Sequence, residues 1–313
     1  MSRIAFLTMD SLADFVSYDQ LVIDLLHSAA IQVDEVSWRK PRVNWDDYSL
    51  VIIRSPWDYQ QQPEAFLEVL ETIERSSATL LNPLATVRWN IRKHYLRDLE
   101  AQGIRIVPTL WMNAPAISQL RNAFETLQTD ELVGKPLIGA NADHAWRLHR
   151  NAPDSRFAQA AAAWATGTAL IQPFVPSIQT DGEISLIWFD GQFSHAVRKV
   201  PAPGDFRVQE EHGAQITPCQ PPADTLQLAA DCHKLFPQTL LYSRVDVVRL
   251  PSGQPAIMEI ELIEPSLYLA FNPQAPQTFA SVIRKRLADP PVRKAPSPLE
   301  LLPEATPQPP AES

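Results

Sequence analysis

Three acidic residues close to the C-terminal end of the sequence carry the clearest chemical signal: Asp246, Glu259 and Glu261. Carboxylates brought close together repel one another and resist ionising at the same time. A hard divalent cation removes that conflict, and proteins hold Mg²⁺ through one or two carboxylates together with the phosphates of a substrate. If the fold gathers these three side chains, they are suited to bind magnesium beside a phosphate group.

The residues around these acids predict a β-hairpin that would place them together. Residues 242–250 and 256–263 are rich in strand-forming residues, and a Pro-Ser-Gly turn separates them. Strand side chains alternate between the two faces of a sheet, so the acids of each strand share one polar face. The alternative is a solvated sheet face on which the acids pair with Arg244 and Arg249.

Two lysines upstream of the hairpin are candidates for contact with phosphate. Lys93 lies in residues 88–100, which have the pattern of one helix with four cations, and a solvated basic face is the default interpretation of such a run. Lys135 lies in the apolar strand predicted at 132–137, where an isolated buried lysine is costly and needs a partner such as a phosphate.

A long loop at 201–213 contributes a third cation, Arg207, among several acids. Pairing of Arg207 with Glu210 or Glu211 is one interpretation, and contact with a transferred phosphoryl group is the other. The loop at 139–144 has a single glycine, so it is a weak signal for a phosphate-cradling loop.

Alternating strands and helices in the first 80 residues predict a parallel sheet. Apolar runs at 3–9, 33–36 and 50–54 are typical of strands, and 19–30 and 64–75 have apolar residues at helical spacing. Ligands of such sheets lie beyond the C-terminal ends of the strands. We therefore expect a ligand near the loops that follow the first and third strands.

These two loops carry the candidate substrate residues Asp10, Ser17, Arg54, Trp57 and Asp58. A guanidinium such as that of Arg54 can hold a carboxylate through two hydrogen bonds, and Trp57 and Tyr59 can shape a pocket. In the alternative interpretation Trp57 packs the domain and Arg54 pairs with Asp58.

The rest of the chain alternates in the same manner. Further strands are expected at 104–111, 169–175, 184–189 and 192–200, with Asp190-Gly191 as a hairpin turn, and helices at 158–167, 223–235 and 277–287. Residues 288–313 hold eight of the 29 prolines and few large apolar residues, which predicts a disordered tail.

Composition narrows the class of protein. The 313 residues are 45% hydrophobic, enough for one large core or two to three smaller ones. A net charge of −9 argues against nucleic acid or an acidic membrane as a partner. No apolar run approaches the roughly 18 residues of a membrane span, and acids stand where a signal peptide is apolar. Because Cys219 and Cys232 form neither a disulfide framework nor a metal motif, we expect a cytoplasmic protein.

Taken in order, the motifs resemble those of the ATP-grasp superfamily. The resemblance rests on RSPWDY, LLNPLATVRWNIRKHYL, VGKPLIG, LIQPFVPSIQTDGEISLIWFDGQFSHAVRK, PGDFRVQEEHG and YSRVDVV with MEIELIEPSL, which span nearly the whole chain except the tail. The sequence is similar to the branch that contains glutathione synthetase and ribosomal-protein-S6 modification ligases. It is closer still to O-ureido-serine cyclo-ligase, the ring-closing enzyme of cycloserine biosynthesis.

This resemblance implies an α/β protein with the ATP-grasp fold. It implies a Rossmann-like substrate domain at 1–88, a central region with a small α+β lid at 89–170, and a C-terminal mixed-sheet ATP-grasp domain at 171–287, followed by the tail at 288–313. ATP would lie between the lid and the C-terminal domain.

The resemblance also implies roles for individual residues. Lys93 and Lys135 would contact the ATP phosphates, and Arg207 would meet the acyl phosphate. Adenine would be held by Leu170, Ile171, Gln172 and Pro173, mainly through backbone groups, and the ribose hydroxyls by Glu183. Asp246, Glu259 and Glu261 would hold two Mg²⁺ ions, with Mn²⁺ as a substitute. Two features depart from the family: many relatives have asparagine where this chain has Glu261, and the lid loop has fewer glycines than usual.

The implied activity is that of an ADP-forming ligase. A carboxylate attacks the γ-phosphate of ATP, and an amine-type nucleophile then displaces phosphate from the resulting acyl phosphate. The resemblance implies amino-acid-like small molecules as partners and a homo-oligomer as in many relatives. One alternative is intramolecular ring closure of the O-ureido-serine type. A further alternative, favoured by the glycine-poor loop, is a non-catalytic nucleotide-binding regulatory protein.

Overall fold

The computed structural model describes residues 2–139, 144–236 and 240–289. The first of its three sheets has strand order β2-β1-β3-β4, and every pair in it is parallel. Its elements are β1 (Arg3–Thr8), α1 (Gln20–Ser28), β2 (Gln32–Ser37), β3 (Leu50–Ser55), α2 (Pro63–Arg75) and β4 (Thr79–Leu81). Helices α1 and α2 cover opposite faces, which is why β1 and β3 are apolar on both sides. The predicted βαβ pattern of this region is confirmed.

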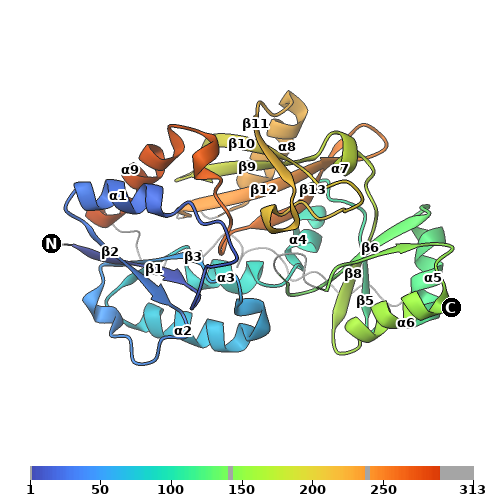
Figure 1. Ribbon diagram of the computed structural model, residues 1–313, viewed down its shortest axis with the longest axis horizontal. Coiled ribbons are helices and arrows are strands. Elements are labelled where there is room, and N and C mark those ends of the chain that lie inside the picture. Colours follow the sequence, from blue (N-terminus) through green and yellow to red (C-terminus); the bar gives the residue numbers. More distant parts are fainter. Residues whose placement is uncertain (1, 140–143, 237–239, 290–313) are drawn as a thin grey trace.

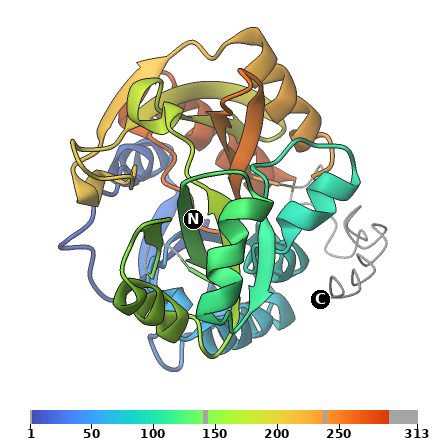
Figure 2. The ribbon, with the colours of Figure 1, turned by 90° about the vertical axis from the view of Figure 1, so that its right-hand side faces the viewer.

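The second sheet forms a separate lobe, at the right of Figure 1 and toward the viewer in Figure 2. It is antiparallel in the order β5-β8-β6-β7. Its elements are β5 (Leu110–Asn113), α5 (Ile117–Thr126), β6 (Glu131–Pro136), β7 (Trp146–His149), α6 (Asp154–Ala163) and β8 (Thr168–Pro173). The two helices and the sheet share a small core that includes Leu120, Phe124, Phe157 and Trp164.

The third sheet is antiparallel in the order β11-β10-β9-β12-β13. Its region comprises α7 (Ser177–Thr180), β9 (Glu183–Phe189), β10 (Gln192–Val200), β11 (Gln215–Cys219), α8 (Ala223–His233), β12 (Tyr242–Arg249) and β13 (Pro255–Glu261). The predicted turn between β9 and β10 is confirmed, because Asp190 and Gly191 have φ of 48° and 78° and Gln192 pairs with Phe189. The acidic hairpin is the pair β12–β13.

Three predicted elements are wrong in their extent. The helix predicted at 158–167 begins earlier, at Asp154, and ends at Ala163. Residues 88–100 form the helices α3 (Leu84–Asn90) and α4 (Tyr95–Ala101) with a break between them. Asn90 ends the first helix and uses its side chain to bond the backbone of β13 at Ile260 and Leu262. The strand predicted at 104–111 begins only at Leu110, since Pro108 has no N–H to donate to a ladder. Before it, Ile106 makes only an isolated bridge to Ile257.

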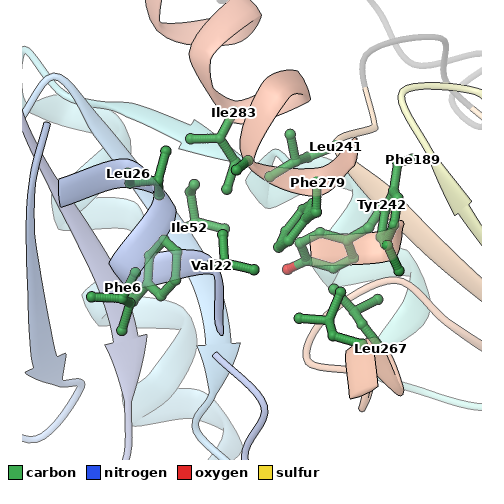
Figure 3. Close-up of a cluster of buried hydrophobic side chains, with 14 of the residues drawn as sticks. Phe6, Val22, Leu26, Ile52, Phe189, Leu241, Tyr242, Leu267, Phe279 and Ile283 are labelled. Atoms are coloured by element: carbon green, nitrogen blue, oxygen red, sulfur yellow. The ribbon is translucent and has the colours of Figure 1, made fainter. Parts of the chain in front are cut away.

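Helix α9 (Ala275–Ala288) joins the third sheet to the first. It lies beside α1 (Figure 1), and the two sheets share one hydrophobic cluster. Figure 3 shows Phe6, Val22 and Ile52 from the first sheet region facing Phe279 and Tyr242. The first and third sheets are therefore packed as one body, whereas the second sheet has its own core.

No helix in the described ranges is long and apolar enough to cross a membrane. The weakly predicted phosphate loop falls on 140–143 for the most part, and the predicted tail falls on 290–313, so both lie outside the described residues.

Candidate active site

A large pocket lies where the three sheets meet. Its wall includes residues from the loop after β3, from the break between α3 and α4, from β6 and β8 of the second sheet, and from the polar face of the third sheet. Among its lining residues are Trp57, Tyr59, Lys93, Lys135, Gln172, Pro173, Glu183, Lys199, Arg207, Arg244, Asp246, Glu259, Glu261 and Glu264.

The three predicted metal-binding acids line this pocket together. Asp246 stands directly opposite Glu259 across the β12–β13 ladder, and Arg244 stands opposite Glu261. The alternation of strand side chains thus brings the acids onto one face. That face is not solvated, because Asp246 is only 2% exposed. The alternative prediction is that the acids pair with Arg244 and Arg249. It is confirmed for Arg244 and wrong for Arg249, which pairs with Asp224.

Cations hold each of these carboxylates. Lys93 donates to Glu259, and Arg244 bonds both Glu261 and Asp246, the latter at 3.0 Å between Nη2 and Oδ2. The ammonium of Lys199 lies 3.4 Å from Asp246 Oδ2. Within the described part of the chain, no three His, Cys, Asp or Glu side chains are already arranged as a metal site. The oxygen donors suit Mg²⁺, and the ion pair with Lys93 engages one oxygen of Glu259.

The charges of the acids differ because their surroundings differ. Burial raises the pKa of Asp246, but Arg244 and Lys199 outweigh it and bring the pKa to about 2. For Glu259, burial is outweighed in the same way by Lys93 and Lys135, and the pKa is lowered. Burial dominates at Glu261 and raises its pKa to about 7 despite Arg244. Of these three acids, Asp246 and Glu259 therefore favour the ionised form, whereas the pKa of Glu261 lies near neutrality.

Lys93 lies in the pocket wall and not on a solvated basic face, and its side chain is 11% exposed. The break between α3 and α4 turns it inward, and its backbone N–H bonds Leu137 O at 3.0 Å. Burial alone would lower the pKa of Lys93, but Glu259 raises it overall. The predicted solvated basic face is therefore wrong for this residue.

Lys135 enters the pocket from β6 of the second sheet. Its ammonium has Met258 Sδ as a partner at 3.3 Å, and among the described residues it makes no ion pair. Burial lowers the pKa of Lys135, although Glu259 acts in the opposite direction. A cation in this position is suited to meet an anionic ligand.

The four residues predicted to hold adenine occupy two different environments. Gln172 and Pro173 line the pocket, as do the next residues, Phe174 and Val175. Leu170 and Ile171 belong to hydrophobic cores, and both pair with strands on each side of β8. Of the four predicted residues, Gln172 and Pro173 are therefore the ones that can meet a ligand in the pocket.

Glu183 lines the pocket in a buried ion pair with Lys199, with 2.5 Å between Oε1 and Nζ. Burial raises the pKa of Glu183, and Lys199 only partly offsets this. The ion pair engages Oε1 of Glu183, and a carboxylate has further lone pairs that can accept from hydroxyl groups. The prediction for this residue has no further support in the geometry.

Arg207 also lines the pocket, but neither predicted acidic partner is correct. It pairs with Asp205 at 2.7 Å, and this hydrogen bond is the main reason that the pKa of Asp205 is lowered. Glu210 instead accepts a hydrogen bond of 2.9 Å from the Tyr18 hydroxyl. With its side chain 37% exposed, Arg207 lies at the pocket wall within reach of solvent.

Of the predicted substrate residues, Trp57 lines the pocket and four others do not. Arg54 is 2% exposed and pairs with Asp19 at 2.9 Å, so the predicted pairing with Asp58 is wrong. Its guanidinium lies over the ring of Tyr242, because β12 and α9 cover this strand end. The other three have local partners: Asp58 bonds Trp38 and Arg39, Asp10 bonds Ser37, and Ser17 accepts from the Asp19 N–H.

Sequence reasoning missed Lys199, Arg244 and Glu264 as pocket residues, whereas Tyr59 lines the pocket as expected. Arg244 was considered only as a counterion of a solvated face. Alternation along β10 could have placed Lys199 inward, because it pairs in register with Glu183. Tyr59 and Glu264 are adjacent only in the folded chain, so no pattern in the sequence links them.

Comparison with solved structures defines the class of this protein. The RimK domain protein ATP-grasp from Sphaerobacter thermophilus aligns with a TM-score of 0.64 at 14% identity, covering 90% of this chain and 100% of that one. D-alanyl-alanine synthetase A from Vibrio cholerae aligns with a TM-score of 0.65 at 12% identity, covering 92% and 98%. The chain has the ATP-grasp fold, as the motifs predicted.

A more specific similarity is to D-cycloserine synthetase DcsG. A family model described as the N-terminal domain of that protein matches residues 4–82. The cycloserine biosynthesis protein DcsG of Streptomyces lavendulae is 29% identical over 297 residues, covering 90% of this chain and 98% of its own. The crystal structure of DcsG aligns with a TM-score of 0.77 at 26% identity, covering 91% and 100%. Fold and similarity together identify an ADP-forming ATP-grasp carbon–nitrogen ligase and confirm the resemblance noted from the motifs.

Proposed function

We propose that this ligase uses Mg²⁺ and ATP to activate the carboxylate of an amino-acid-like small molecule, which an amine-type nucleophile then attacks. The observation that carries the proposal is the pocket itself, where Lys93 and Lys135 face the acids of the β12–β13 hairpin. Cations and carboxylates gathered in one pocket match the needs of phosphoryl transfer, which depends on positioning and charge neutralisation.

Different residues of the pocket would have different roles in this reaction. Lys93 and Lys135 would bind the phosphate oxygens of ATP. The substrate carboxylate attacks the γ-phosphate and ADP leaves, and the amine then displaces phosphate from the acyl phosphate. Arg207 would meet the negative charge that develops at the acyl phosphate. Closure of the second sheet as a lid would keep water from this intermediate.

Asp246, Glu259 and Glu261 would hold the magnesium, two ions in our proposal, with Mn²⁺ as a substitute. Magnesium supplies neutralisation of the phosphate charge when it is bound. A glutamate at position 261 adds a negative charge where many relatives have asparagine. Since burial raises the pKa of Glu261 to about 7, a cation would have to drive its ionisation.

The test is a screen for ADP release over amino acids and small carboxylates, with and without amine acceptors. Wild type should release ADP with at least one acid. Glu259→Gln should reduce that release by at least about 100-fold, because it removes a ligand used in the transition state. Wild-type ADP release from Glu259→Gln with every acid would overturn the metal assignment. Tight binding of Mg·ATP with no turnover of any acid would instead favour a non-catalytic role.

A second candidate is intramolecular ring closure of an O-ureido-serine-type substrate. It is favoured by the similarity to DcsG, which extends over 98% of that relative. The two candidates differ in the number of substrates, so ADP release with a single compound that carries both reacting groups supports ring closure. A strict requirement for a separate amine supports intermolecular ligation. Assembly into a homo-oligomer remains a prediction from the resemblance.

A further inference from the structure

Glu264 is a pocket residue that neither the metal nor the phosphate assignment uses. It follows β13 and is 9% exposed, and it lines the pocket. Its carboxyl is hydrogen-bonded to Tyr59, and in the described ranges it forms no ion pair. The nearest cations are already engaged, Lys93 by Glu259 and Arg244 by Glu261. Burying a carboxyl without a cation is costly, so this position calls for an explanation.

The surroundings of Glu264 are rigid and aromatic. Trp57 donates from Nε1 to the Glu264 carbonyl oxygen at 2.8 Å. Tyr59 is 5% exposed and stacks on Phe66 with ring centroids 4.9 Å apart. Both aromatic residues come from the loop after β3, so the first sheet holds this end of the pocket in place. A buried carboxyl in a pocket wall, held by a rigid neighbour such as Tyr59, can receive an ammonium group through a charge-assisted hydrogen bond.

Glu264 also lies in the same pocket as the residues proposed to bind phosphate and metal. Lys93 and Glu261 are two of these residues. An amine bound here would share the pocket in which the acyl phosphate would form. Burial raises the pKa of Glu264 to about 8, as expected for an acid whose cationic partner arrives with a ligand.

We infer that Glu264, with Tyr59 and Trp57, forms a subsite that binds the protonated amine of the substrate. This inference rests on the proposed function and deepens it. It predicts that the enzyme prefers compounds with a primary ammonium over otherwise identical hydroxy compounds. If Glu264 were only a neutral partner of Tyr59, it would give no such preference.

The experiment measures binding by calorimetry to the full chain saturated with Mg·ADP. The probes are matched pairs: alanine and lactate, serine and glycerate, β-alanine and 3-hydroxypropionate, in both enantiomers where they exist. Wild type should bind at least one amine about tenfold or more tightly than its hydroxy partner. Glu264→Gln should abolish that preference, and Glu264→Asp should retain part of it. The exposed Glu100 provides the matched control, Glu100→Gln, which should behave as wild type.

Each result decides between the alternatives. The absence of an amine preference in wild type overturns the inference even if Glu264→Gln does not fold. An unchanged preference in a folded Glu264→Gln, with Mg·ADP affinity within about twofold of wild type, overturns it as well. Failure of the proposed function is distinguishable, because it appears as a lack of acid-dependent ADP release in wild type, which this binding measurement does not use.

Discussion

Lys135 shows at the scale of one residue how this pocket is prepared for a ligand. Its ammonium has only a thioether as a polar partner among the described residues, and burial lowers its pKa. A buried ammonium without an ion pair destabilises the free protein, and binding of an anion stabilises the folded state.

Lys135→Met is therefore expected to leave the free protein as stable as wild type or more stable, by up to about 1 kcal/mol, because the apolar side chain needs no partner. The affinity for ATP should fall at least tenfold, since one phosphate contact is lost. Urea unfolding and calorimetry with Mg·ATP measure the two effects. A variant that is clearly less stable but binds ATP normally would show that Lys135 is a structural residue.

The raised pKa of Glu264 makes a prediction about pH. Burial raises this pKa from 4.5 to about 8, so between these values the folded state keeps a proton that the unfolded state has released. The free energy of unfolding should then fall as pH rises, by at most about 1.4 kcal/mol per pH unit. Glu261, with a pKa of about 7, acts with the same sign below that pH.

Thermal unfolding of the ligand-free protein from pH 6.5 to 8 tests this prediction. The buried His233, whose pKa is lowered to about 4, favours stability with rising pH only below this window. Glu264→Gln should flatten the slope because it cannot titrate. An equal slope in both proteins would mean that other groups cause the pH dependence.

At the scale of elements, side chains bonded to backbone groups decide where the pocket residues stand. Asn90 bonds β13 at the Ile260 carbonyl and the Leu262 N–H. These bonds fix the end of α3 against the strand that carries Glu259, and the chain then turns and points Lys93 into the pocket. A single straight helix over 88–100, as predicted from its pattern, would not include this turn.

The second sheet depends on a close contact at Gly134 in β6. A Cβ at this position would lie 2.1 Å from the Trp164 ring, whereas one at Gly167 would have no atom within 4 Å. Gly134→Ala should therefore destabilise the second sheet by about 1 to 3 kcal/mol through overpacking. Gly167→Ala is the matched control and should change stability little. Hydrogen exchange in β6 and β8 measures the effect, and equal protection in the two variants would contradict it.

At the scale of the whole molecule, the first and third sheets share one core, whereas the second sheet has a core of its own and contacts the core of the third through Leu170. Asn82, at the end of β4, donates to the carbonyls of Tyr242 and Leu262 and accepts from the Leu241 N–H. These bonds and the cluster in Figure 3 fix the two sheets together. The pocket lies at the junction with the second sheet, which is therefore the part able to move when a ligand binds.

A ligand held between these two bodies should stabilise the molecule as a whole. Mg·ATP at about 100 times its dissociation constant should add about 2.7 kcal/mol to the free energy of unfolding, which raises Tm by several degrees. Glu259→Gln should lose most of this increase, while ATP without Mg²⁺ should give little of it. A scanning calorimeter provides the measurement, and an equal rise in Tm for Glu259→Gln would argue against a metal role for this acid.

The sequence by itself determined the elements of the first sheet and one face of the pocket. Periodicity defined the alternating strands and helices of the first sheet, and strand alternation defined the shared face of Asp246, Glu259 and Glu261, because both depend on near neighbours in the chain. The order of the motifs also indicated the ATP-grasp fold. The partners in ion pairs could not be predicted from the pattern. Arg207 pairs with Asp205 and Arg54 with Asp19, and the sequence favoured other acids for both.

Only the tertiary structure decided which residues meet across the three sheets. Lys93 reaches Glu259 over 166 positions of sequence, and Trp57 reaches the backbone of Glu264 over 207. Such pairs form because whole elements pack against one another, and no local period records that packing. The same packing buries Arg54 beneath β12 and α9 and brings Glu264 to the pocket wall. The expected substrate residue Arg54 therefore lies outside the pocket, and the unexpected residue Glu264 lines it.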